Sequence, residues 1–225
     1  MPMNIAIDGP VGAGKSSIAD QVARRLNILH LDTGAMYRAV ALHVLRSGVN
    51  PLDEKAVAAC CEHADVRVCY VDGAQRTLLG EEDVTALIRT GEVSAAASAV
   101  SSWPAVRRRM VCMQREIAKH ADMLIDGRDI GTNVLPEAPV KIYLTATPEE
   151  RARRRYRQQV EKGEETPYEQ VLAELNARDA RDMSRATDPL RQAEDAVRID
   201  STEMTPEQVV EAIVRRVEEH YGRKA

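Results

Sequence analysis

Eight residues near the beginning of the chain have the types and spacing needed to hold phosphate. Residues 9–16 read GPVGAGKS and match the pattern G-x-x-x-x-G-K-[ST]. Glycines let backbone N–H groups wrap closely around a phosphate, and the N-terminus of a following helix adds positive potential. In such a loop Lys15 reaches the β- and γ-phosphates, and the Ser16 hydroxyl can ligate Mg²⁺. The stretch therefore predicts a nucleoside triphosphate site; the alternative is a glycine-rich helix start without a ligand.

The tripeptide Asp32-Thr33-Gly34 has two interpretations. After a short apolar run, Asp-Thr-Gly presents the catalytic carboxylate of retroviral-type aspartic proteases, in which two such loops share a proton. That site needs a β-rich chain and a symmetric partner loop. Asp32 instead follows a phosphate loop and a helix, and precedes a helix that carries Arg38. We therefore interpret the motif as one wall of a nucleotide pocket, with Asp32 fixing the loop at a strand end.

A third polar loop, IDGRDIG at residues 125–131, ends another strand-like run with Asp126, Arg128 and Asp129. Ligands of open α/β sheets bind just beyond the carboxyl ends of the strands. Because all three motifs follow strand-like runs, we expect them to converge on one edge of a sheet.

Two arginine-rich segments follow later in the chain. In residues 176–185, Arg178, Asp182 and Arg185 are spaced four and three apart, which places them on one helical face. Residues 151–157 read RARRRYR. Arginine grips phosphate in a planar, two-pronged way, which suits a phosphate site. Exposed, salt-bridged helices are the alternative for both segments.

The elements that must position these groups alternate between strand and helix. Short apolar runs predict strands at residues 4–8, 28–31, 123–127 and 140–144, with a weaker fifth at 196–200. Helical spacing covers residues 15–26, a second helix ending near Gly48, and much of 92–120. Residues 65–84 alternate around a DGAQ turn and predict an antiparallel hairpin. The pattern predicts an α/β fold with a parallel sheet covered by helices.

Three helix starts share the pattern Thr-Pro-x-Glu/Gln, at Thr147, Thr166 and Thr205. In each, threonine can cap the helix, proline takes the first helical position and the Glu or Gln completes a capping box.

Composition narrows the class of protein. The chain has 225 residues, a formal net charge of −4 and no apolar run of the length needed to span a bilayer. It starts without a secretory signal, and its four cysteines show no metal-binding spacing, so we expect a cytoplasmic protein with reduced thiols. The negative net charge and the lack of a like-charge tail do not favour nucleic-acid binding.

Three classes of phosphate-loop protein compete. A GTPase should carry a guanine-reading N-K-x-D-like motif, which is absent from the sequence. A large ATP-driven machine normally needs a longer core. A small kinase needs a second pocket with cations for an acceptor, which the arginine-rich motifs supply.

Five motifs in order resemble bacterial-type cytidylate kinases, of the nucleoside monophosphate kinase family. They are IAIDGPVGAGKSS, LDTGAMYRA, DGRDIGT, APVKIYLTA and RDARDMSR. The resemblance covers nearly the whole chain, including the hairpin region, and implies a P-loop NTPase fold with a five-stranded parallel sheet. It also implies one kinase domain: a core of about 1–33, 121–150 and 186–225, a monophosphate-binding lobe of about 34–120 with a β insert at 65–84, and a mobile lid of about 151–170.

The resemblance implies ATP as phosphoryl donor and Mg²⁺ as its metal ion. Mg²⁺ would contact Ser16 and, through water, Asp126. Catalytic roles fall to Lys15, Arg128 and Arg185. The implied ATP-binding residues are Gly9, Gly12, Ala13, Gly14, Lys15, Ser16 and Ser17, with Arg154 and Arg157 from the lid.

For the acceptor, the resemblance implies CMP and dCMP. Arg38 and Arg128 would grip the phosphate, and Thr33, where related sequences often have serine, would bond the nucleotide. Cytosine would be read by Ser98, Arg107 and Asp129, the ribose by Arg178 and Asp182, and the transferring phosphates by Arg185. The resemblance also favours a monomer without nucleic-acid or membrane partners. UMP, AMP, a small acid such as shikimate, or a non-catalytic nucleotide-binding module remain the rival readings.

Overall fold

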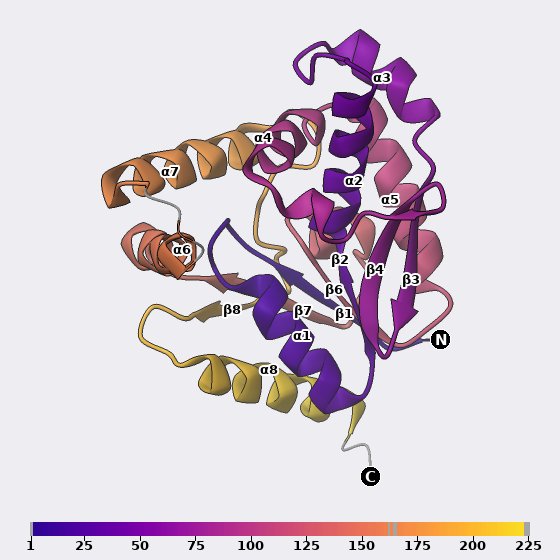
Figure 1. The fold of residues 1–225 in the computed structure, drawn as a ribbon. Helices are drawn as coiled ribbons and strands as arrows, with labels where there is room; N and C mark the ends of the chain where they lie inside the picture. Colours follow the sequence, from indigo (N-terminus) through magenta and orange to yellow (C-terminus); the bar gives the residue numbers. More distant parts are fainter. Residues whose placement is uncertain (1, 162, 164–165, 223–225) are drawn as a thin grey trace. The chain divides into compact units, whose positions relative to one another are not determined.

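A computed structural model describes residues 2–161, 163 and 166–222 of the chain (Figure 1). Its internal contacts divide the chain into two compact units. One consists of Leu29–Asp122 with Pro2, and the other of Met3–Ile28 and the chain from Met123 onward. We call the first the insert unit and the second the core unit.

A five-stranded sheet has the strand order β2-β6-β1-β7-β8. Strand β1 pairs in parallel with β6 on one side and β7 on the other, and β7 pairs in parallel with β8. This confirms the expected parallel sheet. The strands are β1 (Asn4–Asp8), β2 (Leu29–Asp32), β6 (Met123–Gly127), β7 (Val140–Thr145) and β8 (Val197–Asp200).

Helices α1 (Lys15–Leu26) and α8 (Pro206–Tyr221) pack against each other and against strands of the core unit (Figure 1). The central strands bury side chains of both alternating directions, such as Ile5, Ala6 and Ile7 of β1. This is the pattern of a parallel strand covered on both faces. The phosphate loop therefore leaves β1 from a rigid, close-packed base.

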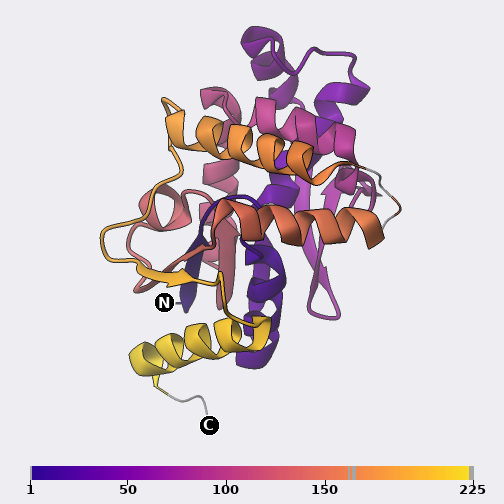
Figure 2. The same cartoon turned by 90° about the vertical axis from the view of Figure 1, so that its left-hand side faces the viewer.

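Two further helices of the core unit, α6 (Pro148–Glu161) and α7 (Tyr168–Ser184), pack side by side (Figure 2). A small cluster of Ala152, Val171 and Leu175 joins them. Residues 162, 164 and 165 of the expected lid lie outside the described residues. A π-helical turn, η2 (Ile130–Val134), follows β6.

The insert unit contains the expected hairpin, β3 (Val66–Val71) and β4 (Ala74–Leu79), in a separate antiparallel sheet. A two-residue strand, β5 (Glu82–Asp83), extends it to three strands. The helical elements are α2 (Thr33–Arg46), α3 (Glu54–Glu62), η1 (Leu87–Arg89), α4 (Gly91–Val100) and α5 (Pro104–Ala118).

Several element boundaries differ from expectation. Strand β2 lies one residue later than predicted, and the helical stretch 92–120 is broken between α4 and α5, where Trp103 caps α5 and Pro104 begins it. Helix α3 and strand β5 were not predicted. Both are short, and only Val57 and Cys61 of α3 are buried, so their apolar pattern is weak.

The three predicted capping boxes have different outcomes. At Thr205 both bonds form: Gln208 N–H donates to Thr205 Oγ1, and Thr205 N–H donates to Gln208 Oε1 at 2.8 Å. At Thr147 the threonine accepts the Glu150 N–H, but the Glu150 carboxylate turns to arginines instead. The prediction for Thr166 was wrong, because α7 begins at Tyr168 and Pro167 is its extended N-cap.

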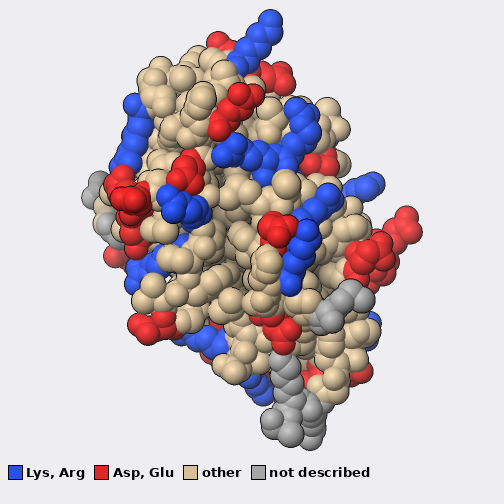
Figure 3. Space-filling view, turned by 90° about the vertical axis from the view of Figure 1, so that its right-hand side faces the viewer, with Lys and Arg blue, Asp and Glu red and all other residues tan. Residues whose placement is uncertain are grey.

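Within the described part of the chain, no helix has the length and apolar character needed to cross a membrane. On the face drawn in Figure 3, acidic and basic side chains are interspersed.

Candidate active site

The phosphate loop joins β1 to α1 in the core unit. Gly12 and Gly14 have φ values of +76° and +85°, a conformation that favours glycine. Lys15 begins α1, and its Nζ donates a hydrogen bond to the Pro10 carbonyl at 2.8 Å. Burial, and then the charge of Arg128, lower the pKa of Lys15 well below its ordinary value. A phosphate placed here would restore the charged form of the lysine, because it supplies the missing counter-charge.

The other loop residues are constrained to different degrees. A Cβ on Gly9 would lie 2.0 Å from the carbonyl oxygen of Leu144, so only glycine fits at the strand end. Ala13 is buried in the core, whereas Ser17 is exposed on the first turn of α1.

Ser16 and Asp126 form a pair of oxygen donors beside the loop. Ser16 Oγ donates a hydrogen bond to Asp126 Oδ2 at 2.8 Å, and Asp126 is buried at the end of β6. Hydroxyl and carboxylate oxygens are ligands that Mg²⁺ prefers, and this ion is usually bound through one or two protein groups plus substrate phosphates. No group of three or more potential His, Cys, Asp or Glu ligands occurs among the described residues. The donor set therefore fits an ion that arrives with a nucleotide.

The loop after β6 is held by Asp8, the last residue of β1. The two carboxylate oxygens of Asp8 accept the N–H groups of Ile130 at 2.8 Å and Gly131 at 2.7 Å. Burial raises the pKa of Asp8 to about 7, although these two hydrogen bonds oppose the shift. Asp129 precedes this turn, is itself buried, and accepts a hydrogen bond from Asn133 Nδ2 at 3.1 Å. Asp8 thus fixes the backbone next to Arg128 and Asp129.

Asp182 on α7 collects arginines around one carboxylate. Arg128 Nε donates to Asp182 Oδ2 at 3.0 Å, and Arg185 forms an ion pair with Oδ1. Burial alone would raise the pKa of Asp182, but the guanidinium groups of Arg128, Arg185 and Arg178 hold it below its ordinary value. Burial likewise disfavours the charge on Arg128, yet Asp182 raises its pKa. The predicted residues Arg128, Arg178, Asp182 and Arg185 are thus electrostatically coupled.

A second buried ion pair forms hydrogen bonds with the backbone of the phosphate loop. Arg151 of α6 pairs with Asp179 of α7, and both are buried. Asp179 Oδ1 accepts the Val11 N–H at 3.0 Å, and Arg151 Nη1 donates to the Val11 carbonyl at 2.9 Å. A Cβ on Gly12 would lie 3.2 Å from Arg151 Cβ, so these helices also press closely on the loop. The α6–α7 pair is therefore anchored to the phosphate loop.

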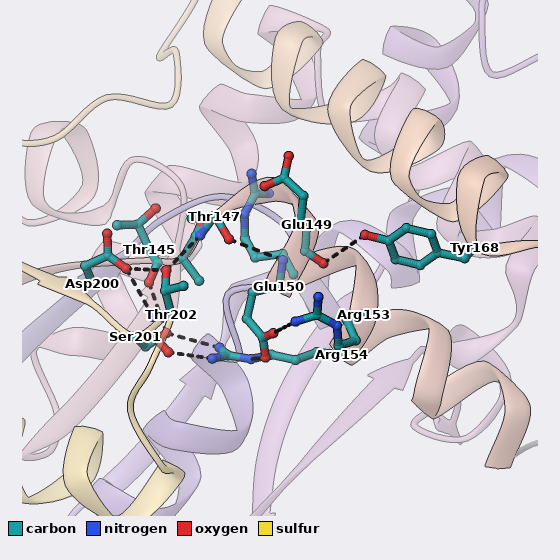
Figure 4. A network of polar contacts seen from close by, with 12 residues as sticks. Thr145, Thr147, Glu149, Glu150, Arg153, Arg154, Tyr168, Asp200, Ser201 and Thr202 are labelled. Carbon is teal, nitrogen blue, oxygen red and sulfur yellow. Dashed lines mark hydrogen bonds and ion pairs between the residues drawn. The ribbon is translucent and has the colours of Figure 1, made fainter.

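The two predicted lid residues lie elsewhere on α6. Arg154 Nε bonds Glu150 at 3.0 Å, and its Nη1 reaches Ser201 Oγ at 3.1 Å, on the segment after β8 (Figure 4). Arg157 is exposed on the same helix. The described contacts of Arg154 thus join α6 to the end of β8.

In the insert unit, Asp32 organises the start of α2. Its Oδ1 accepts the Ala35 N–H at 3.0 Å, and its Oδ2 binds Arg38 at 2.9 Å and Arg89 at 3.2 Å. This agrees with the interpretation of Asp32 as a loop-fixing carboxylate. Thr33 is buried as the first residue of α2.

The predicted base-reading residues of the insert unit lie on α4 and α5. Arg107 is buried, donates to the Ser101 carbonyl at 3.3 Å, and lies over the ring of Tyr37 at 5.6 Å from its centroid. The buried hydroxyl oxygen of Ser98 has no hydrogen-bond partner among the described residues. A buried polar atom of this kind is rare in native structures and favours a ligand contact.

Three residues of these networks were missed from the sequence: Asp8, Arg89 and Asp179. Arg151 lies in the predicted arginine-rich segment 151–157, but it was not singled out there. Asp8 is the last residue of β1 and Asp126 the last but one of β6, so the strand-end rule that selected Asp126 also points to Asp8. The pairing of Arg151 with Asp179 joins two helices, and that of Arg89 with Asp32 spans 57 positions. No local spacing predicts either contact.

Comparison with known proteins identifies the family of the chain. The family model described as "Cytidylate kinase" matches residues 5–219. A cytidylate kinase of Caldicellulosiruptor bescii is 50% identical over 212 residues, covering 94% of each chain. One of Carboxydothermus hydrogenoformans is 47% identical over 222 residues, covering 99% of this chain and 98% of its own.

Among solved structures, an uncharacterized protein from Eubacterium ventriosum shares the fold. It has a TM-score of 0.55 at 13% identity, and the match covers 98% of this chain and 100% of the other. The sequence match spans the phosphate loop, the insert unit and the α6–α7 pair together. The chain belongs to the cytidylate kinase family.

Proposed function

We propose that this protein transfers the γ-phosphoryl group of ATP to CMP, forming ADP and CDP, and that it accepts dCMP in the same way. The observation that carries the proposal is the Asp182 cluster beside the phosphate loop. In this cluster Arg128 and Arg185 form ion pairs with Asp182, which is only 2% exposed. Besides burial, the charge of Arg128 also lowers the pKa of Lys15, so the two cations lie near each other. A transferring phosphoryl group carries negative charge on its oxygens, which such cations stabilise.

The donor side follows from the loop. Backbone N–H groups of Gly12, Ala13 and Gly14, with Lys15, hold the ATP phosphates, and Gly9, Ser16 and Ser17 complete that site. Ser16 and, through water, Asp126 would hold Mg²⁺, which would supply positive charge to offset that of the ATP phosphates. Arg154 and Arg157 are the proposed lid contacts to ATP.

The acceptor needs no strong general base, because its attacking group is already a phosphate. Catalysis is then alignment and charge stabilisation by Lys15, Arg128 and Arg185. Arg38 and Arg128 hold the CMP phosphate, Thr33 bonds the nucleotide, and Arg178 with Asp182 contacts the ribose. Arginine suits these roles, since its fork matches phosphate oxygens and its charge is permanent.

Cytosine offers an amine that needs an acceptor and two atoms, O2 and N3, that need donors. Asp129 supplies a carboxylate, and Ser98 and Arg107 supply hydroxyl and guanidinium groups. The buried Ser98 oxygen, for which the described part of the chain offers no hydrogen-bond partner, supports this assignment.

The proposal includes an arrangement of parts: a core of about 1–33, 121–150 and 186–225, a monophosphate-binding lobe of about 34–120, and a lid of about 151–170. Closure of the lid and lobe would exclude water, so that ATP is not lost to hydrolysis. We also propose a cytoplasmic monomer that acts on nucleotides and not on nucleic acid.

The test is ADP release from ATP and Mg²⁺ with CMP, dCMP, UMP, AMP, GMP or shikimate in parallel. We expect CMP to be the best acceptor and dCMP to follow. A different best acceptor would refute the substrate assignment. ATP binding without ADP release for any acceptor would instead identify a non-catalytic nucleotide-binding module.

Two variants test the residue roles. Arg128→Ala should lower turnover strongly with the fold intact, and an active, CMP-saturable variant would refute its role. Asp129→Ala should weaken the binding of CMP far more than that of ATP. Equal losses of affinity for the two nucleotides would contradict the proposal that Asp129 reads the cytosine base. Arg216→Ala on α8, an exposed arginine paired with Glu219, is the matched control.

A further inference from the structure

Strand β4 of the antiparallel sheet lies next to β2, the last strand in the order of the five-stranded sheet (Figure 1). The side-chain amide of Gln75 on β4 bonds both backbone groups of Asp32, the final residue of β2. The Asp32 N–H donates to Gln75 Oε1 at 2.7 Å, and Gln75 Nε2 donates to the Asp32 carbonyl at 3.3 Å. A residue of a neighbouring antiparallel strand exchanges the same two hydrogen bonds through its backbone. One glutamine side chain thus takes the place of a pairing strand.

The antiparallel sheet holds this amide in one orientation. Gln75 and Thr77 lie on the same face of β4, and Gln75 Nε2 also donates to Thr77 Oγ1 at 3.3 Å. Thr77 is 1% exposed, and its own backbone is fixed: its N–H donates to Thr85 Oγ1 at 2.9 Å, and its carbonyl accepts the Val84 N–H at 2.9 Å. A flipped amide would lose both bonds to Asp32, because Oε1 cannot donate and Nε2 cannot accept.

The two bonds to Asp32 fix the peptide that leads into α2. The Asp32 carbonyl belongs to the peptide bond between Asp32 and Thr33, and a planar trans peptide points its N–H away from its carbonyl. Because the carbonyl faces Gln75, the Thr33 N–H points to the opposite side, at the first residue of the helix. The Asp32 side chain supports the same turn, since its Oδ1 accepts the Ala35 N–H. Backbone and side chain of this N-cap are thus held by different partners.

We propose that Gln75 is a positioning residue for acceptor binding, which acts through the backbone of Asp32 and Thr33 and does not touch the nucleotide. It places the Thr33 hydroxyl and the first turn of α2 before the substrate arrives, so that less ordering is needed on binding. The antiparallel sheet then has a task in the reaction, because its Gln75 face holds the acceptor-binding turn. This inference rests on the proposed function, in which Thr33 bonds the nucleoside monophosphate.

Three variants test the role of this amide. Gln75→Met keeps an unbranched side chain of similar length and removes both hydrogen-bonding groups. Gln75→Glu keeps an acceptor for the Asp32 N–H but places a second oxygen against the Asp32 carbonyl. Arg76→Met is the matched control, because Arg76 is exposed on the opposite face of β4 and lies 3.9 Å from Asp83. The Kd of CMP is measured by calorimetry, and kcat, the KM for each substrate and the melting temperature are measured for every variant.

Gln75→Met should weaken CMP binding about 5- to 30-fold, as expected for the loss of one or two neutral hydrogen bonds. The KM for ATP should stay within about twofold, and Arg76→Met should match wild type in both. Gln75→Glu should recover little of the CMP affinity, because it cannot donate to the Asp32 carbonyl. Assays are run well below each melting temperature, so that lower stability alone changes neither KM.

Unchanged CMP affinity in Gln75→Met, or equal increases in the KM for CMP and for ATP, would overturn the proposal, because a merely structural role does not select one substrate. Full CMP affinity in Gln75→Glu would also overturn it, since the Asp32 carbonyl would then need no donor. If the methionine variant does not fold, the glutamate variant is judged by the same two KM values.

Wild-type turnover with CMP is measured in parallel. If another monophosphate proves to be the best acceptor, the substrate assignment fails, and the variants are compared with that nucleotide instead. If wild type uses CMP and Gln75→Met keeps the wild-type affinity for it, the proposed function stands and the role of Gln75 fails.

Discussion

Asp8 provides a direct test of the electrostatics of the core. It lies buried at the end of β1, where burial raises its pKa from 3.8 to about 7. Asp8→Asn removes the titrating group and nearly keeps its shape. The asparagine amide cannot accept hydrogen bonds from both backbone N–H groups that bond Asp8. We therefore expect the variant's free energy of unfolding to fall by about 1–3 kcal/mol at every pH. The informative quantity is the change in pH dependence.

The sign follows from proton linkage. The folded protein holds the Asp8 proton more tightly than the unfolded chain, so the contribution of Asp8 to stability is greatest below pH 3.8 and is lost as pH rises to about 7. A tenfold change in proton affinity is worth about 1.4 kcal/mol, so ionising Asp8 in the folded state costs about 4 kcal/mol in total. About 2–3 kcal/mol of this falls between pH 5 and pH 8.

The assay is urea unfolding at half-unit pH steps from 5 to 8. The free energy of unfolding of wild type should fall over this range by about 2–3 kcal/mol more than that of Asp8→Asn. Asp72→Asn, in the exposed β3–β4 turn, should keep the wild-type dependence. If the free energy of unfolding of Asp8→Asn also keeps the wild-type pH dependence, Asp8 does not titrate between pH 5 and pH 8, which would refute the raised pKa.

Three further changes test other parts of the structure. Asp179→Asn weakens the hydrogen bond to the Val11 N–H and should raise the KM for ATP about tenfold, with little effect on the KM for CMP. Glu174→Gln on the exposed side of α7 is the control. Equal increases in both KM values would contradict the inference that Asp179 anchors the phosphate loop. Gly9→Ala puts a Cβ 2.0 Å from the Leu144 carbonyl and should prevent folding, measured by circular dichroism; a wild-type melting temperature would disprove this. Thr205→Ala removes the capping box of α8 and should cost about 1 kcal/mol in urea unfolding, whereas an unchanged midpoint would show that the cap contributes nothing.

Strands inside the sheet were easier to predict from the sequence than the strand β8 at its edge. Strands β1 and β6 pair over five residues and are buried almost throughout, so their apolar runs were unmistakable. Strand β8 is an edge strand that buries only Ile199, which explains its weaker signal. Strand β5 consists of two acidic residues, and its pairing with β4 depends on tertiary structure alone.

The site residues divide in the same way. Motifs with fixed spacing pointed to Lys15, Ser16 and Asp126, because local backbone geometry determines where such side chains lie. Contacts between distant elements were not predictable, as with Asp179 on Val11. Arg154 illustrates the limit: the helix that carries it was predicted from the pattern at Thr147, but its bonds to Ser201 depend on how α6 meets the end of β8.

The attachment of α6 gives this helix the geometry of a lever. Arg151 and Arg154, which bond Val11 and Ser201, both lie in its first two turns and make that end a pivot. Glu161, the last residue of α6, is ten residues beyond Arg151, roughly 15 Å away at about 1.5 Å per residue. Tilting the helix by about 10° would swing its far end by on the order of 3 Å while the pivot stays nearly still. A tilt about this end would therefore displace the tip of α6 far more than the residues that bond the phosphate loop.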